Sequence, residues 1–170
     1  MKVSIITASY NSSKTIKSCV DSVLNQNFND IEYIIVDGES SDDTLLKINK
    51  VLNKFNNIKV FSEKDKGIYD ALNKGVDLAK GDVIGFVHSD DLLASPQIIS
   101  EIVKKIRNEN LDGVYGDLNY VSRNNINKIV RNWKSCELDY DLLKKGWIPP
   151  HPSFFIKKSI YEKHGVFNLN

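Results

Sequence analysis

Short apolar runs alternate with segments of helical periodicity along the first two thirds of the chain. Four apolar runs predict buried strands, at residues 2–7, 31–36, 58–61 and 83–87. Apolar residues at helical spacing predict helices from Ser12 or Ser13 to Leu24, from Ser40 to Phe55, over residues 68–78 and from Ser95 and Pro96 to about Asn108. Gly81 follows the third helix, where a C-terminal cap is expected. Such alternation predicts a mostly parallel central sheet with helices on both faces.

The pattern changes after residue 111. Residues 114–121 and 126–133 predict two strands joined by a turn at residues 123–125, which makes a small antiparallel addition to the α/β fold. The rest of the chain predicts a short helix over 138–145, a proline-rich loop at 146–152, a strand over 153–156 and a helix over 158–164. Nothing marks a linker or an internal repeat, so the 170 residues predict a single domain.

The charge balance and the cysteines exclude several classes of protein. The chain has 23 basic and 22 acidic residues, so no basic face for nucleic acid is expected. Cys19 and Cys136 lack the spacing of a metal site or a disulfide framework, which favours a reducing compartment. The chain begins with a strand, and no apolar stretch approaches the roughly 20 residues of a membrane-spanning helix. We therefore expect a cytoplasmic protein.

Two adjacent carboxylates, Asp90 and Asp91, close the sequence VIGFVHSDD at residues 83–91. In open α/β sheets, ligands bind beyond the carboxyl ends of the strands. Carboxylate oxygens suit hard divalent cations, so this pair is well placed to hold Mg²⁺ or Mn²⁺ and, through the cation, a diphosphate. The alternative is that both are solvated loop acids that favour the N-terminus of the next helix.

Polar residues also follow the other three predicted strands. The segment TASYN at residues 7–11 follows the first strand, Asp37 the second and Asp65 the third. A parallel sheet brings these ends to one edge, where small residues admit a flat base and carboxylates accept hydrogen bonds from a base N–H or from ribose hydroxyls. Taken singly, Asp37 fits a turn before Gly38 equally well, and Asp65 fits a solvated loop among lysines.

The chain has no glycine-rich phosphate loop. No G-x-G-x-x-G follows the first strand, and no G-x-x-x-x-G-K-S/T occurs anywhere. Dinucleotide-dependent oxidoreductases and P-loop NTPases are therefore disfavoured, and phosphate binding would fall to a metal ion.

Five segments together resemble the N-terminal part of family 2 glycosyltransferases with the GT-A fold. They are VSIITASYN at 3–11, SVLNQNF at 22–28, DGESSDDT at 37–44, DKGIYDALNKG at 65–75 and GDVIGFVHSDD at 81–91. They occur in the family's order and cover residues 2–93 almost continuously. Residues 115–153 resemble a subgroup that builds bacterial surface polysaccharides. The resemblance implies a GT-A, Rossmann-like fold, with a nucleotide-binding half at 1–110 and the start of an acceptor-side half at 111–170.

The resemblance also implies roles for individual residues. Asp91 would be the metal ligand, with Mn²⁺ or Mg²⁺ as the cofactor, in a D-x-D-type motif whose first acidic place is taken by serine. The residues implied to bind the nucleotide sugar are Thr7, Ala8, Tyr10, Asp37, Asp65, Ser89 and Asp90. His151, between two prolines, is either an ordinary loop or core residue or a contact near the diphosphate or acceptor. For His88, packing is the favoured interpretation, and Trp147 fits a sugar-stacking role and a buried anchor equally well.

The implied activity is transfer of a sugar, with inversion, from a nucleotide-diphospho-sugar to a saccharide or lipid-linked acceptor. A UDP-sugar is the expected donor. Inverting transfer needs a general base, which the resemblance implies to lie beyond Asn170, with Asp117 and His151 as candidates inside the chain. Residue 168 is asparagine where the family commonly has aspartate. We therefore expect these 170 residues to bind a donor better than they transfer its sugar.

Other functions and partners stay open at this point. The chain also fits a non-catalytic module that binds a nucleotide sugar. A sugar-1-phosphate nucleotidyltransferase would need a glycine-rich, basic loop after the first strand, and a receiver domain would need an acid pair there. Neither feature is present. Association with the inner membrane face and a homo-oligomer are both compatible with the sequence.

Overall fold

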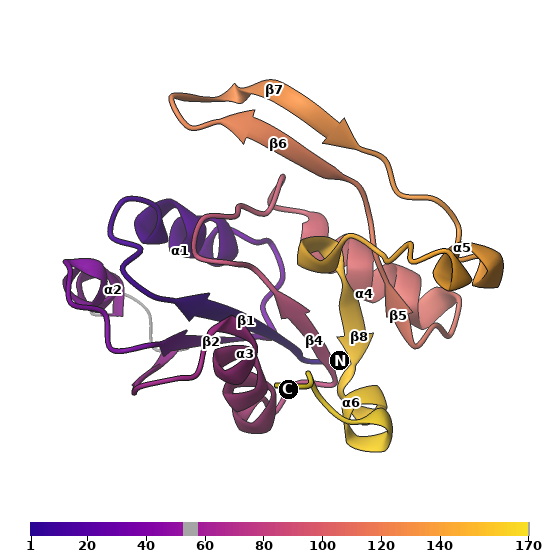
Figure 1. The fold of residues 1–170 in the computed structure, drawn as a ribbon, viewed down its shortest axis with the longest axis horizontal. Coiled ribbons are helices and arrows are strands. Elements are labelled where there is room, and N and C mark those ends of the chain that lie inside the picture. The colour runs from indigo at the N-terminus through magenta and orange to yellow at the C-terminus, as the bar shows by residue number, and fades with distance from the viewer. Residues whose placement is uncertain (53–57, 170) are drawn as a thin grey trace.

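The structure is a computed structural model that describes residues 1–52 and 58–169 (Figure 1). Its strands are β1 (Val3–Ser9), β2 (Ile31–Asp37), β3 (Ile58–Ser62), β4 (Val83–Phe86), β5 (Gly113–Val114), β6 (Leu118–Ser122), β7 (Asn125–Trp133) and β8 (Phe155–Lys157). Its α-helices are α1 (Ile16–Leu24), α2 (Thr44–Leu52), α3 (Ile68–Leu78), α4 (Ile98–Asn108), α5 (Tyr140–Lys144) and α6 (Lys158–His164), and a 3₁₀ turn covers His151–Ser153.

A six-stranded sheet in the order β3-β2-β1-β4-β8-β5 forms the centre of the molecule. Strands β1 to β4 are parallel to one another, β8 runs antiparallel to β4, and β5 runs antiparallel to β8. β6 and β7 form a separate antiparallel hairpin, which stands apart at the top of Figure 1. The predicted α/β fold with a mostly parallel sheet and an antiparallel addition after residue 111 is confirmed.

Apolar side chains on both faces of the sheet hold the helices in place. Every residue of β1 is buried, as expected for a central parallel strand covered on both sides. The core on one face includes apolar residues of α1, α2 and α4, and the core on the other includes those of α3. Tyr161 of α6 and Phe167 pack against the second core. Both faces are therefore closed, which leaves the ends of the strands as the places where polar side chains can gather.

Several predicted boundaries differ from the structure because tertiary contacts decide them. The first helix begins after Thr15 rather than at Ser12 or Ser13, and the fourth begins at Ile98, after a turn at Ser95. The predicted strand 114–121 is divided, because its start pairs with β8 while its end pairs with β7. The prediction that the second helix continues to Phe55 falls outside the described residues.

Two further predictions need correction. Gly81 does not cap α3, whose C-terminal cap is Ala79. A side chain at residue 81 would instead come within 2.6 Å of the backbone nitrogen of Ser4, so this glycine permits close packing of two backbones. The loop predicted at 146–152 contains the start of the 3₁₀ turn at His151, since a proline is tolerated in the first turn of a helix.

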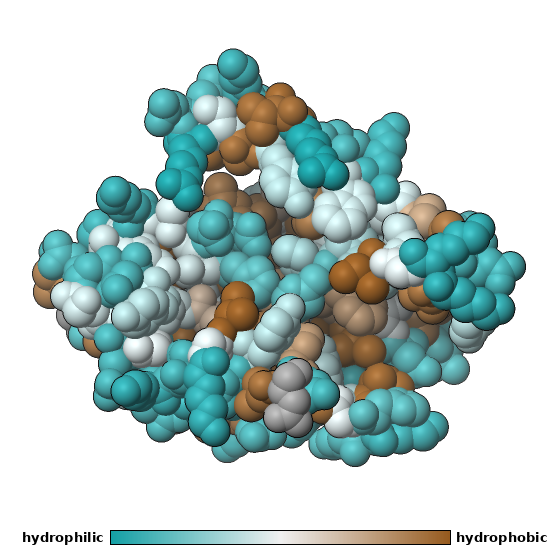
Figure 2. Space-filling model, viewed as in Figure 1, coloured by the Kyte–Doolittle hydropathy of each residue, from teal (hydrophilic) through white to brown (hydrophobic). Residues whose placement is uncertain are grey.

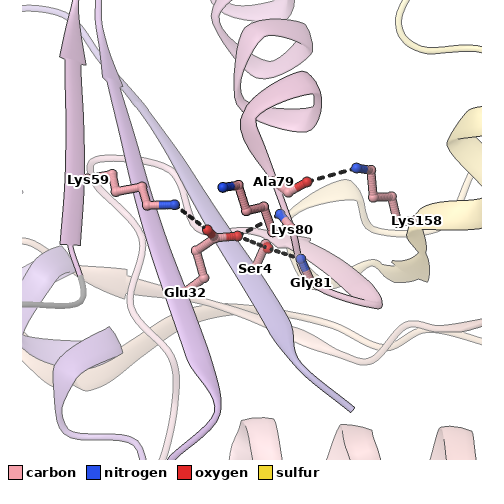
Figure 3. A network of polar contacts seen from close by, with 7 residues as sticks. All are labelled: Ser4, Glu32, Lys59, Ala79, Lys80, Gly81 and Lys158. Atoms are coloured by element: carbon pink, nitrogen blue, oxygen red, sulfur yellow. Dashed lines mark hydrogen bonds and ion pairs between the residues drawn. The ribbon is translucent and has the colours of Figure 1, made fainter.

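Glu32 anchors a polar network at the amino-terminal edge of the sheet (Figure 3). This buried carboxylate accepts hydrogen bonds from the Ser4 hydroxyl, the Lys59 ammonium and the Lys80 backbone N–H, each at 2.7 Å. Burial by itself would raise the pKa of Glu32, but these hydrogen bonds outweigh it and lower the pKa to about 2. The network joins β1, β2, β3 and the segment that leads into β4.

Removing this carboxylate is expected to make the fold less stable in a pH-dependent way. The folded-state pKa of Glu32 lies below the unfolded value, so its contribution is complete above about pH 4.3 and is lost as the pH falls towards 2. Glu32→Gln should lower the free energy of unfolding by about 2 kcal/mol at pH 7. Its difference in stability from the wild type should become smaller below pH 4. Urea denaturation at several pH values measures this. Glu109→Gln, which removes an exposed carboxylate paired with Lys105, should change stability by less than about 0.5 kcal/mol.

Within residues 1–52 and 58–169, no helix is long and apolar enough to cross a membrane.

Candidate nucleotide-sugar site

The carboxyl ends of β1, β2 and β3 meet at the carboxylate of Asp37. This side chain is fully buried, and both of its oxygens accept hydrogen bonds. One oxygen accepts from the hydroxyls of Ser9 (3.0 Å) and Ser40 (2.5 Å), and the other from the Ser40 backbone N–H (2.9 Å) and the Ser62 hydroxyl (2.9 Å). Asp37 therefore fixes three strand ends relative to one another, beneath the surface of the predicted site.

Gly38, directly after Asp37, lies against Asp65 and Tyr10. A Cβ atom at residue 38 would come 2.5 Å from a carboxylate oxygen of Asp65 and 3.4 Å from the Tyr10 ring. The other Asp65 oxygen accepts a hydrogen bond from the Gly67 backbone N–H at 2.9 Å. Two residues predicted to bind the nucleotide are thus brought together over a glycine, with the Tyr10 ring largely exposed.

Thr7 and Ala8 are buried where β1 ends. The Thr7 hydroxyl donates a hydrogen bond to the Val87 carbonyl at 2.6 Å and lies 3.0 Å from the Tyr33 hydroxyl. Thr7 therefore connects β1 to the segment that carries Asp90 and Asp91. The proposed contact of Thr7 and Ala8 with a nucleobase stays a prediction.

The segment after β4 presents Ser89, Asp90 and Asp91. The Ser89 hydroxyl lies 2.8 Å from the hydroxyl of Ser12, in the loop after β1. Asp90 is exposed, whereas one carboxylate oxygen of Asp91 is buried and has no hydrogen-bond partner among the described residues. Burial and the neighbouring Asp90 charge raise the pKa of Asp91 to about 6. A buried carboxylate oxygen without a donor is costly for the fold and is often retained for function.

Asp91 fits a divalent cation by its chemistry and its unpaired oxygen. Mg²⁺ and Mn²⁺ take oxygen ligands, and Mg²⁺ is commonly held by one or two carboxylates together with substrate phosphates and water. Among the described residues, no group of three or more His, Cys, Asp or Glu side chains converges to form a complete metal site. Asp91 would therefore supply only part of a coordination shell, and the other ligands of a cation would have to come from a bound diphosphate and water.

Two histidines meet next to this segment, and the sequence alone did not predict their meeting. His88 Nε2 and His151 Nδ1 lie 3.4 Å apart, and the other ring nitrogen of each is buried without a partner among the described residues. Burial lowers the pKa of both imidazoles, which favours their neutral forms. His151 also lines a shallow pocket of about 250 Å³ with residues of α6. No local sequence signal marks this pair, because the two histidines are 63 positions apart in the chain and lie in the loop after β4 and in the 3₁₀ turn.

Asp117, a candidate general base, lies at the start of the β6–β7 hairpin. One of its oxygens accepts hydrogen bonds from the backbone N–H (2.8 Å) and the hydroxyl (2.9 Å) of Ser135, and these bonds lower its pKa. Trp147 is half-buried, with its ring edge-on to Tyr115 at a centroid distance of 6.1 Å. Neither residue has a described contact with the segment after β4.

The sequence profile "Glycosyl transferase family 2" matches residues 4–165. The chain belongs to glycosyltransferase family 2. A "PGL/p-HBAD biosynthesis glycosyltransferase" of Mycobacterium bovis is 32% identical over 168 residues, which is 98% of this chain and 63% of that protein. A "Chondroitin synthase" of Escherichia coli is 43% identical over 91 residues, or 54% of this chain and 13% of that protein. The chain thus spans less than two thirds of the length of these curated relatives.

Solved structures share the fold of this family 2 chain. TarS 1-349 of S. aureus, in complex with UDP-GlcNAc, superposes with a TM-score of 0.81 at 22% identity over 99% of this chain and 49% of that chain. The mannosyltransferase PcManGT of Pyrobaculum calidifontis, in complex with GDP-Man and Mn²⁺, superposes with a TM-score of 0.75 at 19% identity over 98% of this chain and 47% of that chain. The predicted GT-A fold is confirmed.

Proposed function

We propose that this chain carries the donor site of an inverting glycosyltransferase. Its substrates are a nucleotide-diphospho-sugar, with a UDP-sugar as the first choice, and a saccharide or lipid-linked acceptor. The observation that carries the proposal is the buried, unpaired oxygen of Asp91 at the carboxyl end of β4, on the same edge as Asp37 and Asp65. Family membership and the nucleotide sugars bound by TarS and PcManGT support a nucleotide-sugar donor, and the UDP-GlcNAc bound by TarS favours a UDP-sugar among them.

The nucleoside would lie over Gly38, between Asp65 and Tyr10. The missing side chain at Gly38 lets the Asp65 carboxylate lie close against the backbone, where it can accept hydrogen bonds from base or ribose, and the Tyr10 ring offers a face for stacking. Asp37, which is fully buried with both oxygens already bonded, would act from below by holding the strand ends in register. Thr7 would act in the same way, since its hydroxyl is bonded to the Val87 carbonyl.

Asp91 would bind the metal ion, with Asp90 close to the ribose or sugar. Mn²⁺ or Mg²⁺ held there supplies positive charge that stabilises the leaving nucleoside diphosphate. Ser89 keeps this segment against the loop after β1 through its contact with Ser12. The unpaired nitrogens of His88 and His151 are suited to hydrogen bonds with phosphate oxygens or an acceptor hydroxyl.

The general base is proposed to lie beyond Asn170. Asp117 is a poor candidate because its hydrogen bonds with Ser135 favour the ionised form and thereby weaken it as a base. We assign Asp117 instead to positioning the β6–β7 hairpin, whose two ends its carboxylate joins. His151 remains a candidate through its unpaired ring nitrogen.

Adding a methyl group at Gly38 is expected to reduce donor binding selectively. In Gly38→Ala the new Cβ would displace the Asp65 carboxylate, which lies within 2.5 Å of its position. UDP affinity should fall by about tenfold, as expected when one well-placed polar contact is lost, while the thermal midpoint changes by no more than a few degrees. Gly116→Ala is the matched control, because a Cβ there meets no atom within 4 Å. Unchanged UDP binding in Gly38→Ala would exclude the proposed place of the nucleoside.

The proposed reaction is tested with a panel of UDP-, dTDP- and GDP-sugars in the presence of Mn²⁺. Binding of one donor by this chain, with release of the nucleoside diphosphate that depends on an added saccharide, would establish transfer. Binding without acceptor-dependent release would favour the module that only binds a nucleotide sugar. If none of the donors bound, the proposal for this chain would be wrong.

A further inference from the structure

The β6–β7 hairpin carries an unbalanced charge. Residues 118–134 contain no Asp or Glu, although the whole chain has 22 acidic and 23 basic residues. The same seventeen positions carry the cations Arg123, Lys128, Arg131 and Lys134, all of them exposed. Because acidic residues are common elsewhere on the surface, an acid-free and largely exposed hairpin is a local feature of this element.

The same hairpin exposes aliphatic side chains at its outer end. Ile126, Ile129 and Val130 of β7 are exposed to 58%, 55% and 60%. Figure 2 shows apolar side chains among hydrophilic ones on the projection at the top of the molecule, where Figure 1 places the hairpin. Clustered apolar residues with a polar rim mark a surface that binds another surface, whereas single exposed apolar residues do not.

The hairpin is held in a defined conformation. Arg131 lies opposite Tyr120 in the strand register, with its guanidinium 5.3 Å from the Tyr120 ring centre and 6.0 Å from that of Trp133. At the base, the Asp117 carboxylate accepts two hydrogen bonds from Ser135 and so ties the first strand to the residues after the second. The cations and the aliphatic residues are therefore presented by an ordered element and not by a loose loop.

We propose that the β6–β7 hairpin docks on an anionic membrane surface. The aliphatic residues would enter the boundary between headgroups and acyl chains, while the four cations bind acidic headgroups at about 1 kcal/mol each. A second copy of the chain is disfavoured as the occupant, because two such hairpins would place positive charge against positive charge. The inference is independent of the donor site, and it would hold the molecule at the surface where a lipid-linked acceptor lies.

The test is sedimentation of the chain with lipid vesicles. Vesicles of phosphatidylcholine alone are compared with vesicles that also contain phosphatidylglycerol. One variant reverses two charges on the hairpin, Arg123→Glu with Lys128→Glu. A second variant, Ile126→Thr with Ile129→Thr and Val130→Thr, keeps β-branched side chains and so preserves the strand. The matched control, Lys50→Glu with Lys104→Glu, makes the same change of net charge on exposed positions of α2 and α4.

The wild-type chain is expected to bind only the anionic vesicles and to be released in about 1 M salt, where charges are screened beyond about 3 Å. Each hairpin variant should bind at least about tenfold more weakly, as expected for the loss of two cations or three aliphatic contacts, while the control stays within about twofold. Circular dichroism and UDP binding should be unchanged in both hairpin variants.

The proposal is overturned if the wild type binds neutral and anionic vesicles equally, or if the control variant weakens vesicle binding as much as the charge-reversed hairpin variant does. Failure to bind vesicles, together with a dimer that the hairpin variants dissociate, would assign the hairpin to a second copy instead.

Discussion

Asp91→Asn is expected to weaken Mn²⁺-dependent binding of UDP by about 100-fold, because the proposed metal site would lose its main protein ligand. The same substitution should raise the free energy of unfolding without ligand by about 1 kcal/mol. The reason is that one oxygen of Asp91 is buried without a hydrogen-bond donor, while Asp90 carries a second negative charge next to it. A residue whose removal stabilises the fold while it abolishes binding is retained for function and not for stability.

Thermal unfolding with and without UDP and Mn²⁺ measures both effects at once. Ligands that bind the folded state raise the midpoint according to their affinity, so the wild type should gain stability from the pair and Asp91→Asn should not. Asp21→Asn serves as the control, because it removes a partly exposed carboxylate on α1 whose ion pair, among the described residues, is with Lys17. An Asp91→Asn chain that is still stabilised by UDP and Mn²⁺ would show that the metal lies elsewhere.

Asp37→Asn is expected to destabilise the fold by about 2–3 kcal/mol, since an amide cannot accept the hydrogen bonds that the buried carboxylate accepts on both oxygens. The amide NH₂ would face hydrogen-bond donors from Ser40 and either Ser9 or Ser62. Donor binding should weaken as well, because the ends of β1, β2 and β3 would lose their common partner.

Urea denaturation at pH 7 gives the stability change, with Asp112→Asn as the control for loss of an exposed carboxylate. That control should stay within about 0.5 kcal/mol of the wild type. If Asp37→Asn kept its stability but lost UDP binding, Asp37 would contact the nucleotide directly, as the resemblance implied, and our assignment of a supporting role would be wrong.

The elements of this fold could be predicted from sequence to a large extent. The helices over residues 68–78 and 158–164 begin and end as predicted, because their apolar spacing is regular and polar loops flank them. The strand predicted at 114–121 was wrong in its pairing. Its first residues join β8, which lies some 40 residues further along the chain, and such a long-range partner leaves no local signal.

The candidate site was predictable in its residue types and less so in its geometry. Strand ends rich in acids indicated Asp37, Asp65 and Asp91, because parallel strands finish at a common edge. Sequence alone did not show that Asp37 is buried beneath that edge, or that Gly38 lies against Asp65 and Tyr10. These relations depend on the distances between neighbouring loops, which only the folded structure defines.

The most direct test of the account is a calorimetric titration of UDP into the chain, once with Mn²⁺ and once with a chelator. We predict binding with Mn²⁺ that becomes at least about tenfold weaker without it, because the diphosphate would need the cation that Asp91 is proposed to hold. Uridine, which lacks the diphosphate, should bind weakly and equally in both conditions. Binding of UDP that is indifferent to Mn²⁺, or no binding of UDP, GDP or dTDP under either condition, would contradict a metal-assisted donor site at the carboxyl end of β4.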